Sequence, residues 1–567
     1  MVTVIETLRE RLHTALRGLG LPVDQTIQVV PAADPRFGDY QTNAGMVLAK
    51  ERKENPRLLA ERIAQAVDVS GISKPPEVAG PGFINFRLER KFIASQLIKA
   101  YADERRGVAR TDDPKTLIIE FSSPNIAKPM HVGHIRSTVL GDVLARVARF
   151  IGHTVITDNH LGDWGTQFGK VIYGWKNLRD EAALGTHPVD ELVRLYRAAD
   201  AAAKEDSGIL EACRNELIKL QQGDPENIAI WRKSIELSTT EFAGTYRILG
   251  VEFDQQLGES FYNAELSSIV ERLLKSGIAE VSEGAVVVWD RDLSDAPFMI
   301  RKSDGGFGYA ITDVATLEYR VREWNPDGIW YVVGTPQQLH FQQLFSLARK
   351  LGLKLDLQHI GFGSILGEDR KMMRTRSGDS VPLRELLDEA VTRAKALVIE
   401  KNSELAQAEV EQIAEMVGIG AIKYTELSQH RLTDYVFSWS KMLSFQGNTA
   451  PYLQNAYVRS RSIFRRLKEP FHPPSQVELG DPAEEKLAKK LLQFGEVVPA
   501  VLDGFRPNVL ANYLYELAAE YHVFYEQCPV LSAETDQRNQ RLLLSDLFAR
   551  TLKLGLQLLG IQVPERM

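Results

Sequence analysis

The sequence predicts an α/β protein of several domains, with a nucleotide-binding domain at its centre and an all-helical domain at its end. Residues 117–121 form a short apolar run typical of a buried parallel strand, and residues 135–151 then carry apolar side chains at helical spacing. The second half of the same sheet is expected from strand-forming runs at 285–289, 298–301 and 330–333. From about residue 385 the pattern is essentially helical throughout.

Composition limits the possible classes of protein. The chain of 567 residues has room for three or four domains, and its formal net charge of -7 gives no general attraction to nucleic acid, although local basic stripes would suffice. Cys213 and Cys528 lie far apart without metal or redox spacing, which favours a reducing compartment. The first 20 residues are amphipathic and charged, unlike a signal peptide, and no apolar run could span a bilayer. We expect a soluble, cytoplasmic protein without membrane contacts.

Residues 1–108 are predicted to form a separate α/β unit. Helices are expected at 3–18, 42–50 and 56–67, and strands near 27–30 and at 83–88. Two blocks stand out in this unit, at 37–43 and 80–85. Taken alone, each is most simply a turn followed by a buried aromatic side chain.

Residues 122–134 join the first central strand to its helix and read Ser-Ser-Pro-Asn-Ile-Ala-Lys-Pro-Met-His-Val-Gly-His. Helix N–H groups at such a turn attract phosphate. His131 and His134 lie on one side of the first helical turn, and Gly133 leaves room for a flat base. Protonated or hydrogen-bonding imidazoles would stabilise charge at a phosphorus under attack. Two alternatives are a metal-binding pair, for which no third ligand follows at suitable spacing, and a helix cap beside a surface histidine.

The whole block resembles the HIGH signature of class I aminoacyl-tRNA synthetases, in the form found in arginyl-tRNA synthetases. A match of this length is far more specific than the His-x-Gly-His core. The resemblance implies a Rossmann-type HIGH catalytic domain at 109–384, in which His131, Gly133 and His134 bind ATP and the two histidines are catalytic. It also implies that the N-terminal domain at 1–108 binds the tRNA elbow at the D-loop, where Phe83 and Asn85 would stack on and hydrogen-bond a splayed base.

After the predicted strand at 154–157, the block 158–169 combines glycines, polar side chains and aromatic rings. Its place directly after a strand puts it at the carboxyl edge of the sheet, where ligands bind α/β proteins, and it too resembles the arginyl enzymes. The segment at about 180–255 is helical and charged. We interpret it as a helical insertion, too short and too helical for a hydrolytic editing domain.

Three small clusters accompany the second half of the sheet, at 258–260, 309–313 and 337–340. A pocket for a guanidinium should offer carboxylates and an aromatic face, although a single carboxylate is more often a helix cap or a surface ion pair. The resemblance assigns an arginine-binding set: Glu259, Tyr309 and Asp313 at the side chain, Asn125 and Gln337 toward the α-amino end, and Glu120 nearby.

Residues 359–364 and 371–379 form a basic, glycine-containing segment placed to close over a triphosphate, so Gly361 and Gly363 are predicted to bind ATP. It occupies the place of the family's KMSKS loop but departs from it, because Arg374 or Arg376, depending on register, replaces the expected catalytic lysine. The resemblance implies that Lys128 supplies the missing charge and that activation waits for bound tRNA. The alternative for Lys128 is a solvated turn residue.

In the C-terminal part, residues 448–466 interleave tyrosines and arginines without an acidic residue. The segment resembles the helical anticodon-binding domain of arginyl- and cysteinyl-tRNA synthetases, which gives a connecting region at 385–440 and an anticodon-binding domain at 441–567. Tyr452, Tyr457 and Arg459 are the predicted tRNA contacts. An amphipathic core helix with a basic outer face is the alternative from the residues alone.

The resemblance therefore implies a class I arginine–tRNA ligase. Its substrates would be ATP, with Mg²⁺ on the phosphates and no dedicated protein metal site, L-arginine and tRNA(Arg), and we expect a monomer. Two other classes are a small-molecule adenylate-forming ligase and a catalytically dead RNA-binding paralogue. The first would have no use for the two outer domains, and the second would not need the histidines, Lys128 and the pocket residues.

Overall fold

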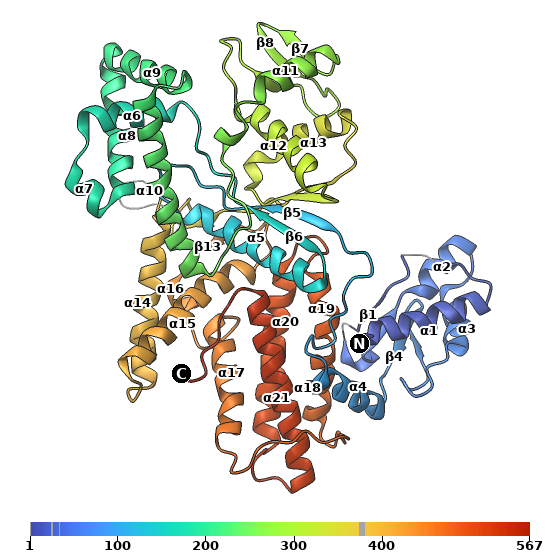
Figure 1. Cartoon of the computed structure of the whole chain (residues 1–567). Helices are drawn as coiled ribbons and strands as arrows, with labels where there is room; N and C mark the ends of the chain where they lie inside the picture. The colour runs from blue at the N-terminus through green and yellow to red at the C-terminus, as the bar shows by residue number, and fades with distance from the viewer. Residues whose placement is uncertain (1, 24–25, 33, 374–379) are drawn as a thin grey trace. The chain divides into compact units, whose positions relative to one another are not determined.

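The computed structural model describes residues 2–23, 26–32, 34–373 and 380–567, and the chain forms two compact units (Figure 1). Unit 1 contains Met1–Arg110, Phe445–Gln557 and Gln562–Met567. Unit 2 contains Thr111–Ser444 and Leu558–Ile561. The predicted central domain therefore lies in unit 2, and the two outer domains lie in unit 1.

A four-stranded parallel sheet forms the centre of unit 2, in the order β11-β10-β5-β6. Its strands are β5 (Thr116–Glu120), β6 (Thr154–Asp158), β10 (Gly328–Tyr331) and β11 (Asp356–His359). The middle of β5 is almost fully buried, as expected for an apolar strand covered on both faces. In register, Glu120 pairs with Asp158 and with Tyr331, so the carboxyl ends of the strands meet at one edge.

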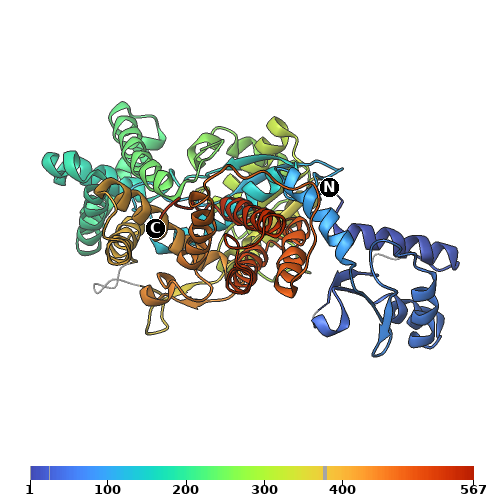
Figure 2. The same ribbon diagram turned by 90° about the horizontal axis from the view of Figure 1, so that it is seen from below.

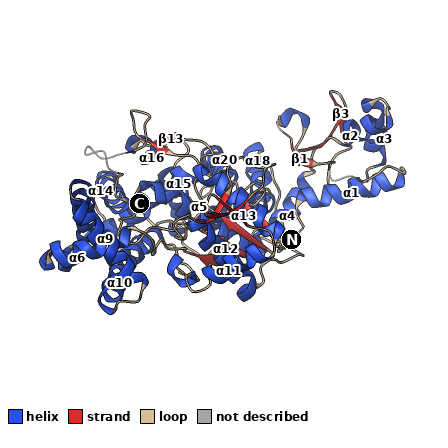
Figure 3. Ribbon diagram, turned by 90° about the horizontal axis from the view of Figure 1, so that it is seen from above, coloured by secondary structure: helices blue, strands red, loops and turns tan. Residues whose placement is uncertain are grey.

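Helices cover this sheet. The helix α5 (Val132–Ile151) provides the crossover between the parallel neighbours β5 and β6, and α12 (Tyr309–Trp324) and α13 (Gln338–Lys350) lie beside the strands drawn in red in Figure 3. One hydrophobic core joins Ile118 and Ile329 of the sheet to α11 (Leu266–Lys275), α12 and α13. The Rossmann-type arrangement predicted around 117–151 is confirmed.

The prediction that 285–289 and 298–301 return to the central sheet is wrong. These residues form β8 (Ala285–Val288) and β9 (Phe298–Arg301), which pair with β7 (Glu280–Ser282) in a separate antiparallel sheet. The reason lies in the connections, because parallel neighbours require a crossover of a dozen or more residues and these strands are joined by short loops. Only the run at 330–333 belongs to the parallel sheet, as β10.

Helices also form the rest of unit 2. The insertion is helical as predicted. It comes after α6 (Gln167–Leu178) and contains α7 (Glu181–Thr186), α8 (Pro188–Glu205), α9 (Ser207–Gln221) and α10 (Pro225–Leu249). Farther along come η2 (Glu259–Tyr262), η3 (Thr335–Gln337), α14 (Leu383–Lys401), α15 (Gln407–Leu427) and α16 (Trp439–Met442). Two short strands, β12 (Ile365–Leu366) and β13 (Tyr435–Val436), pair in parallel.

The N-terminal part of unit 1 is the predicted α/β unit. Its antiparallel sheet has the order β1-β2-β4-β3, with β1 (Val29–Pro31), β2 (Tyr40–Thr42), β3 (Glu77–Ala79) and β4 (Phe83–Phe86). Its helices are α1 (Val4–Gly18), η1 (Pro35–Phe37), α2 (Ala44–Arg52), α3 (Pro56–Ala66) and α4 (Arg90–Ala102). Local signals explain the starts: Thr3 and Glu6 form a capping box, and Asn55 caps a helix that begins with Pro56.

The C-terminal part of unit 1 is all helical, as predicted. It consists of α17 (Ala450–Arg465), α18 (Pro482–Leu492), α19 (Phe494–Ala500), α20 (Pro507–Gln527) and α21 (Thr535–Leu558). Figure 2 views these helices roughly along their axes. Among the described helices of both units, none is long and apolar enough to cross a bilayer.

Candidate active site

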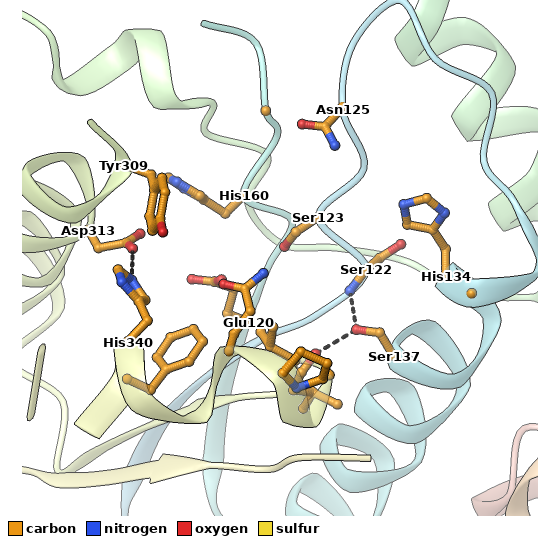
Figure 4. A pocket seen from close by; sticks show the side chains of 18 of the residues that line it. Glu120, Ser122, Ser123, Asn125, His134, Ser137, His160, Tyr309, Asp313 and His340 are labelled. Atoms are coloured by element: carbon orange, nitrogen blue, oxygen red, sulfur yellow. Dashed lines mark hydrogen bonds and ion pairs between the residues drawn. The ribbon is translucent and has the colours of Figure 1, made fainter. Parts of the chain in front are cut away.

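A cavity of about 660 Å³ opens at the carboxyl edge of the parallel sheet (Figure 4). It collects side chains that are far apart in the sequence, as the crevice of a doubly wound sheet does. The predicted residues that line it are Glu120, Asn125, His131, Gly133, His134, Glu259, Tyr309, Asp313 and Gln337. The ATP and arginine residues expected from separate motifs therefore surround one space.

Hydrogen bonds at the start of α5 determine which ring nitrogen of His131 and of His134 carries the proton. His131 caps the helix, with its Nδ1 accepting from the Gly133 N–H at 3.1 Å, and His134 Nδ1 accepts from the His131 N–H at 3.0 Å. Burial lowers the pKa of His134 to about 3, and burial together with the Lys128 charge lowers the pKa of His131. Both rings are therefore neutral at pH 7, and each carries its proton on Nε2 as a hydrogen-bond donor. Hydrogen-bonding imidazoles, rather than protonated ones, are the form present here.

The turn before these histidines has unusual backbone geometry. Ser122, Ser123 and Ala127 have φ of 73°, 49° and 59°, a region that non-glycine residues seldom occupy. Ser137 of α5 holds the turn, because its Oγ accepts from the Ser122 N–H at 2.9 Å and donates to the Val332 carbonyl at 2.6 Å. Figure 4 shows this serine pair beside His134. The turn is thus fixed against both α5 and the end of β10.

Asn125 lies in the same turn, close to the chain that follows β6. The Ile126 N–H donates to the Gly162 carbonyl at 3.0 Å, and a Cβ on Gly162 would lie 2.3 Å from Asn125 Oδ1. Glycine leaves room for the Asn125 side chain, which any larger residue at 162 would have to displace. This contact places the Asn125 amide at the cavity wall.

Glu259 provides a carboxylate with altered acidity. It begins η2 directly after β6 and the insertion, and its neighbour Ser260 donates to Asp163 through both N–H and Oγ, at 2.8 and 2.6 Å. Burial raises the pKa of Glu259 to about 7, with Asp313 and Asp163 adding to the rise and His160 opposing it. A cation in the cavity would reverse this shift by stabilising the ionised form.

Tyr309 and Asp313 are four residues apart on α12, so both project from one face of the helix toward the cavity (Figure 4). Asp313 Oδ2 lies 2.6 Å from Nε2 of His340 on α13, and the His340 ring lies 4.9 Å from the Tyr309 ring. Tyr309 is 64% exposed. An aromatic face and an anchored carboxylate therefore stand together near Glu259.

Glu120, also predicted to bind arginine, already has a cationic partner within the protein. Arg320 of α12 is fully buried and donates from one Nη2 to Glu120 at 2.6 Å and to Asp158 at 2.7 Å. These carboxylates end the neighbouring strands β5 and β6. Glu120 lines the cavity, but this ion pair gives it a clear structural task at the sheet edge.

Comparison with known proteins identifies the family. Three family models match: "tRNA synthetases class I (R), catalytic domain" over residues 96–439, "DALR anticodon binding domain" over 453–567 and "Arginyl tRNA synthetase N terminal domain" over 6–88. The chain belongs to the arginyl-tRNA synthetase family. It is 42% identical to the arginine–tRNA ligase of Chromobacterium violaceum and 43% identical to that of a Synechococcus strain, in each case over 100% of both chains.

Solved structures of the family have the same fold. The arginyl-tRNA synthetase of Plasmodium falciparum superposes with a TM-score of 0.86 at 30% identity, covering 100% of both chains. That of Thermus thermophilus gives a TM-score of 0.84 at 26% identity, covering 99% of this chain and 100% of the other. The predicted architecture of N-terminal α/β domain, Rossmann-type catalytic domain and helical anticodon-binding domain is confirmed.

The other residues predicted to act on ATP lie near the cavity but do not line it, as far as the structure describes them. Lys128 is exposed in the turn and does not line the cavity, although its charge acts on His131. Gly361 and Gly363 flank Phe362, which does line it, and a Cβ on Gly363 would lie 2.6 Å from Asp434 Oδ1. Gly363 thus has a packing requirement of its own. The predictions for Arg374 and Arg376 lie outside the described residues.

The predicted tRNA contacts in α17 differ in exposure. Tyr457 is 4% exposed and its hydroxyl donates to Glu565 at 3.0 Å, so it lies in the core rather than on the surface. Tyr452 is partly exposed and packs 5.1 Å from the His522 ring, and the Arg459 guanidinium stands 4.9 Å over Tyr525. The alternative of an amphipathic core helix with a basic outer face describes α17 well.

In the N-terminal sheet, Phe83 and Asn85 lie on the same face of β4, since they are two residues apart. Phe83 is partly exposed. Asn85 is 4% exposed and donates to the Glu77 carbonyl at 3.3 Å, while its Oδ1 has no hydrogen-bond partner among the described residues.

Sequence reasoning missed several side chains of the cavity. His160 lines it and Asp163 holds Ser260 beside Glu259, and both lie in the block at 158–169 that was placed at the sheet edge without individual roles. His340 closes the cluster at 337–340. The position of the block at 158–169 directly after a strand was the signal that its side chains reach a ligand site. The individual roles could not be predicted, because Asp163 pairs with Ser260 and His340 pairs with Asp313, and these partners come from distant segments.

Proposed function

We propose that this cavity is where ATP and arginine react, with the neutral His131–His134 pair on the phosphate side and the carboxylates of Glu259 and Asp313 on the arginine side. The overall reaction is that of an arginine–tRNA ligase, which converts ATP, L-arginine and tRNA(Arg) to AMP, diphosphate and L-arginyl-tRNA(Arg). One observation carries the proposal: a single cavity is lined both by two imidazole donors at a helix N-terminus and by a pair of carboxylates.

In the first step, a carboxylate oxygen of arginine attacks the α-phosphorus, the bond from that phosphorus to the bridging oxygen breaks, and diphosphate leaves with the electron pair. Charge grows on the phosphate oxygens during this step. The two Nε2–H donors suit that charge, because preorganised donors stabilise it without reorganisation. The product is arginyl-adenylate.

Recognition of arginine requires both charge and shape. The guanidinium would pair with Asp313 and Glu259 and lie against the Tyr309 ring, while Asn125 and Gln337 would bind the α-amino end. His340 keeps the Asp313 carboxylate in place. Glu120 contributes through the sheet edge that it and Arg320 hold together.

In the second step, a hydroxyl of the terminal ribose of tRNA attacks the arginyl carbonyl, AMP leaves with the electrons of the broken anhydride bond, and the hydroxyl proton passes to the departing phosphate. No covalent enzyme intermediate is needed. For the approach of tRNA, we assign Phe83 and Asn85 to the elbow and Tyr452 and Arg459 to the anticodon arm, whereas Tyr457 supports α17 from inside.

ATP brings Mg²⁺ with its phosphates in this proposal. Phosphate oxygens are ligands that Mg²⁺ prefers. Among the described residues, no group of three His, Cys, Asp or Glu side chains is arranged to hold a metal ion. Lys128 and either Arg374 or Arg376 would add positive charge at the phosphates, and Gly361 and Gly363 would shape the adjoining wall. We further propose that the protein acts as a cytoplasmic monomer.

The experiment is ATP–diphosphate exchange with tRNA(Arg) present, comparing arginine with citrulline. Citrulline has nearly the same shape but no charge, so a carboxylate pocket should reject it by roughly a thousandfold or more in kcat/KM. Exchange that is equally fast with both amino acids would contradict the assignment of Glu259 and Asp313.

A further inference from the structure

The segment after β11, residues 361–366, forms one wall of the cavity, and we call it the wall segment. Phe362 lines the cavity, and its carbonyl accepts from the Thr335 N–H and Oγ at 3.3 and 2.9 Å. Its ring also lies near Gly334, another residue that lines the cavity. The wall segment therefore helps to shape the same space that His134 lines.

A second segment, residues 431–437, supports the wall segment, and we call it the clasp. The Gly363 N–H donates to the Arg431 carbonyl at 2.9 Å, and the Ser364 N–H donates to Asp434 Oδ1 at 2.5 Å. Beyond them, β12 of the wall segment pairs in parallel with β13 of the clasp. The absence of a Cβ at Gly363 permits this close approach, so the wall segment packs directly on the clasp.

Arg136, two residues after His134, reaches the clasp from α5. Its Nε lies 3.0 Å from Glu426 Oε2 on α15, and its Nη1 donates to the Thr433 carbonyl at 3.0 Å. Tyr435 of the clasp donates its hydroxyl to the other oxygen of Glu426, and the Arg136 guanidinium stands 5.4 Å over the Tyr435 ring. Arg136 and Glu426 are 4% and 7% exposed. One guanidinium thus contacts the clasp at two points, the Thr433 carbonyl and the Tyr435 ring, and contacts α15 at Glu426.

The histidine turn is also tied to the far end of the loop that follows the wall segment. The Val132 N–H donates to the Val381 carbonyl at 2.9 Å, and the Leu383 N–H donates to the Met130 carbonyl at 2.8 Å. Residues 130–136 therefore contact the chain on both sides of the KMSKS-like segment: 381–383 directly, and 361–366 through the clasp.

We propose that Arg136 is a positioning residue for ATP activation, which sets the wall segment at a fixed place relative to His131 and His134 through Glu426 and the clasp. The inference deepens the proposed function and rests on it. A misplacement of about 1 Å at a reacting group can cost roughly a hundredfold in rate, so a side chain that fixes two walls of one site has a measurable kinetic effect.

A purely stabilising ion pair is the competing explanation. Buried ion pairs contribute little net stability, because desolvation offsets their attraction. Burial also raises the pKa of Glu426 to about 7 although Arg136 opposes the rise, so protonation of this carboxyl is an accessible alternative to an ionic partner. Charge balance alone does not require a guanidinium, whereas the second contact, to the Thr433 carbonyl, requires a forked donor.

The test compares Arg136→Met, Glu426→Gln and the double variant Arg136→Met/Glu426→Gln. ATP–diphosphate exchange with tRNA(Arg) gives kcat and KM for ATP and for arginine, and thermal unfolding gives Tm. Arg146→Gln is the matched control, because Arg146 also lies on α5 and joins a carboxylate, Asp142, to a backbone carbonyl, that of Gly250, but does not contact the clasp.

We expect Arg136→Met to lose at least about tenfold in kcat/KM for ATP while KM for arginine stays within about twofold. The double variant should regain most of the lost Tm, because no carboxylate is left without a partner, but not the ATP kinetics. Arg146→Gln should keep the parent kinetics.

Parent-like ATP kinetics in Arg136→Met, or recovery of both Tm and kinetics in the double variant, would overturn the positioning role. If the single variant does not fold, the double variant still decides between the two explanations. Absence of exchange in the parent enzyme would instead count against the proposed function, which separates the two failures.

Discussion

Glu259 should make arginine binding depend on pH near neutrality. Its pKa is raised to about 7 in the free cavity, so the carboxyl is mostly protonated at pH 6 and mostly ionised at pH 8. Arginine carries a permanent positive charge and favours the ionised form, so binding must release the proton at low pH. The affinity of the enzyme for arginine should therefore rise as the pH rises.

The size of the effect comes from the ionised fraction. With a pKa of about 7, this fraction rises from about one-eleventh at pH 6 to about ten-elevenths at pH 8, which is about tenfold in affinity or about 1.4 kcal/mol. Glu259→Gln keeps the shape but cannot ionise. It should weaken binding at pH 8 by at least about tenfold and flatten the dependence on pH.

The assay is calorimetric titration of the enzyme with arginine at pH 6, 7 and 8, in buffers of different ionisation enthalpy so that proton release is measured as well. Glu265→Gln is the control, since Glu265 lies nearby in sequence but forms an exposed ion pair with Arg322. If the parent enzyme binds arginine equally at pH 6 and 8, or if Glu259→Gln retains the parent's pH dependence, the reasoning about this carboxylate is refuted.

Three further predictions concern charge at the substrates. Asp313→Asn should lower kcat/KM for arginine by roughly a hundredfold, on the order of 3 kcal/mol, because a desolvated guanidinium loses its partner, and an unchanged KM and rate would remove Asp313 from the pocket. Lys128→Ala should slow single-turnover adenylate formation with tRNA(Arg) present by about a hundredfold with little change in arginine binding, whereas a rate within about threefold of the parent would end its catalytic role. Arg459→Ala should weaken tRNA binding and reduce its salt dependence while adenylate formation persists, with the buried Tyr457→Phe as control; normal charging at limiting tRNA across salt concentrations would leave α17 as a core helix only.

Local patterns predicted the catalytic core well. The apolar run at 117–121, the turn at 122–134 and the helical periodicity after it were enough to place the histidines at a helix N-terminus beside a parallel sheet. Such features depend on neighbours in the chain, and the length of the matching block made the family assignment specific.

Features that depend on distant partners were not predictable in this way. The strands β8 and β9 have the composition of sheet strands, but nothing in their residues says which sheet they join. Likewise, the hydroxyl of Tyr457 finds its acceptor in Glu565, far along the chain, and the neutral state of His134 depends on how the turn is packed. The link from Arg136 to Glu426 joins two helices through a contact that no local pattern encodes.

We propose above that this cavity activates arginine for transfer to tRNA(Arg). The most direct measurement is charging of tRNA(Arg) by the purified protein with ATP and radiolabelled arginine, in parallel with lysine and citrulline and with a His134→Ala variant. We expect arginyl-tRNA from the parent enzyme, no charging with lysine or citrulline, and a rate at least about a hundredfold lower for His134→Ala. Charging with lysine at a comparable rate, or full activity in His134→Ala, would contradict it.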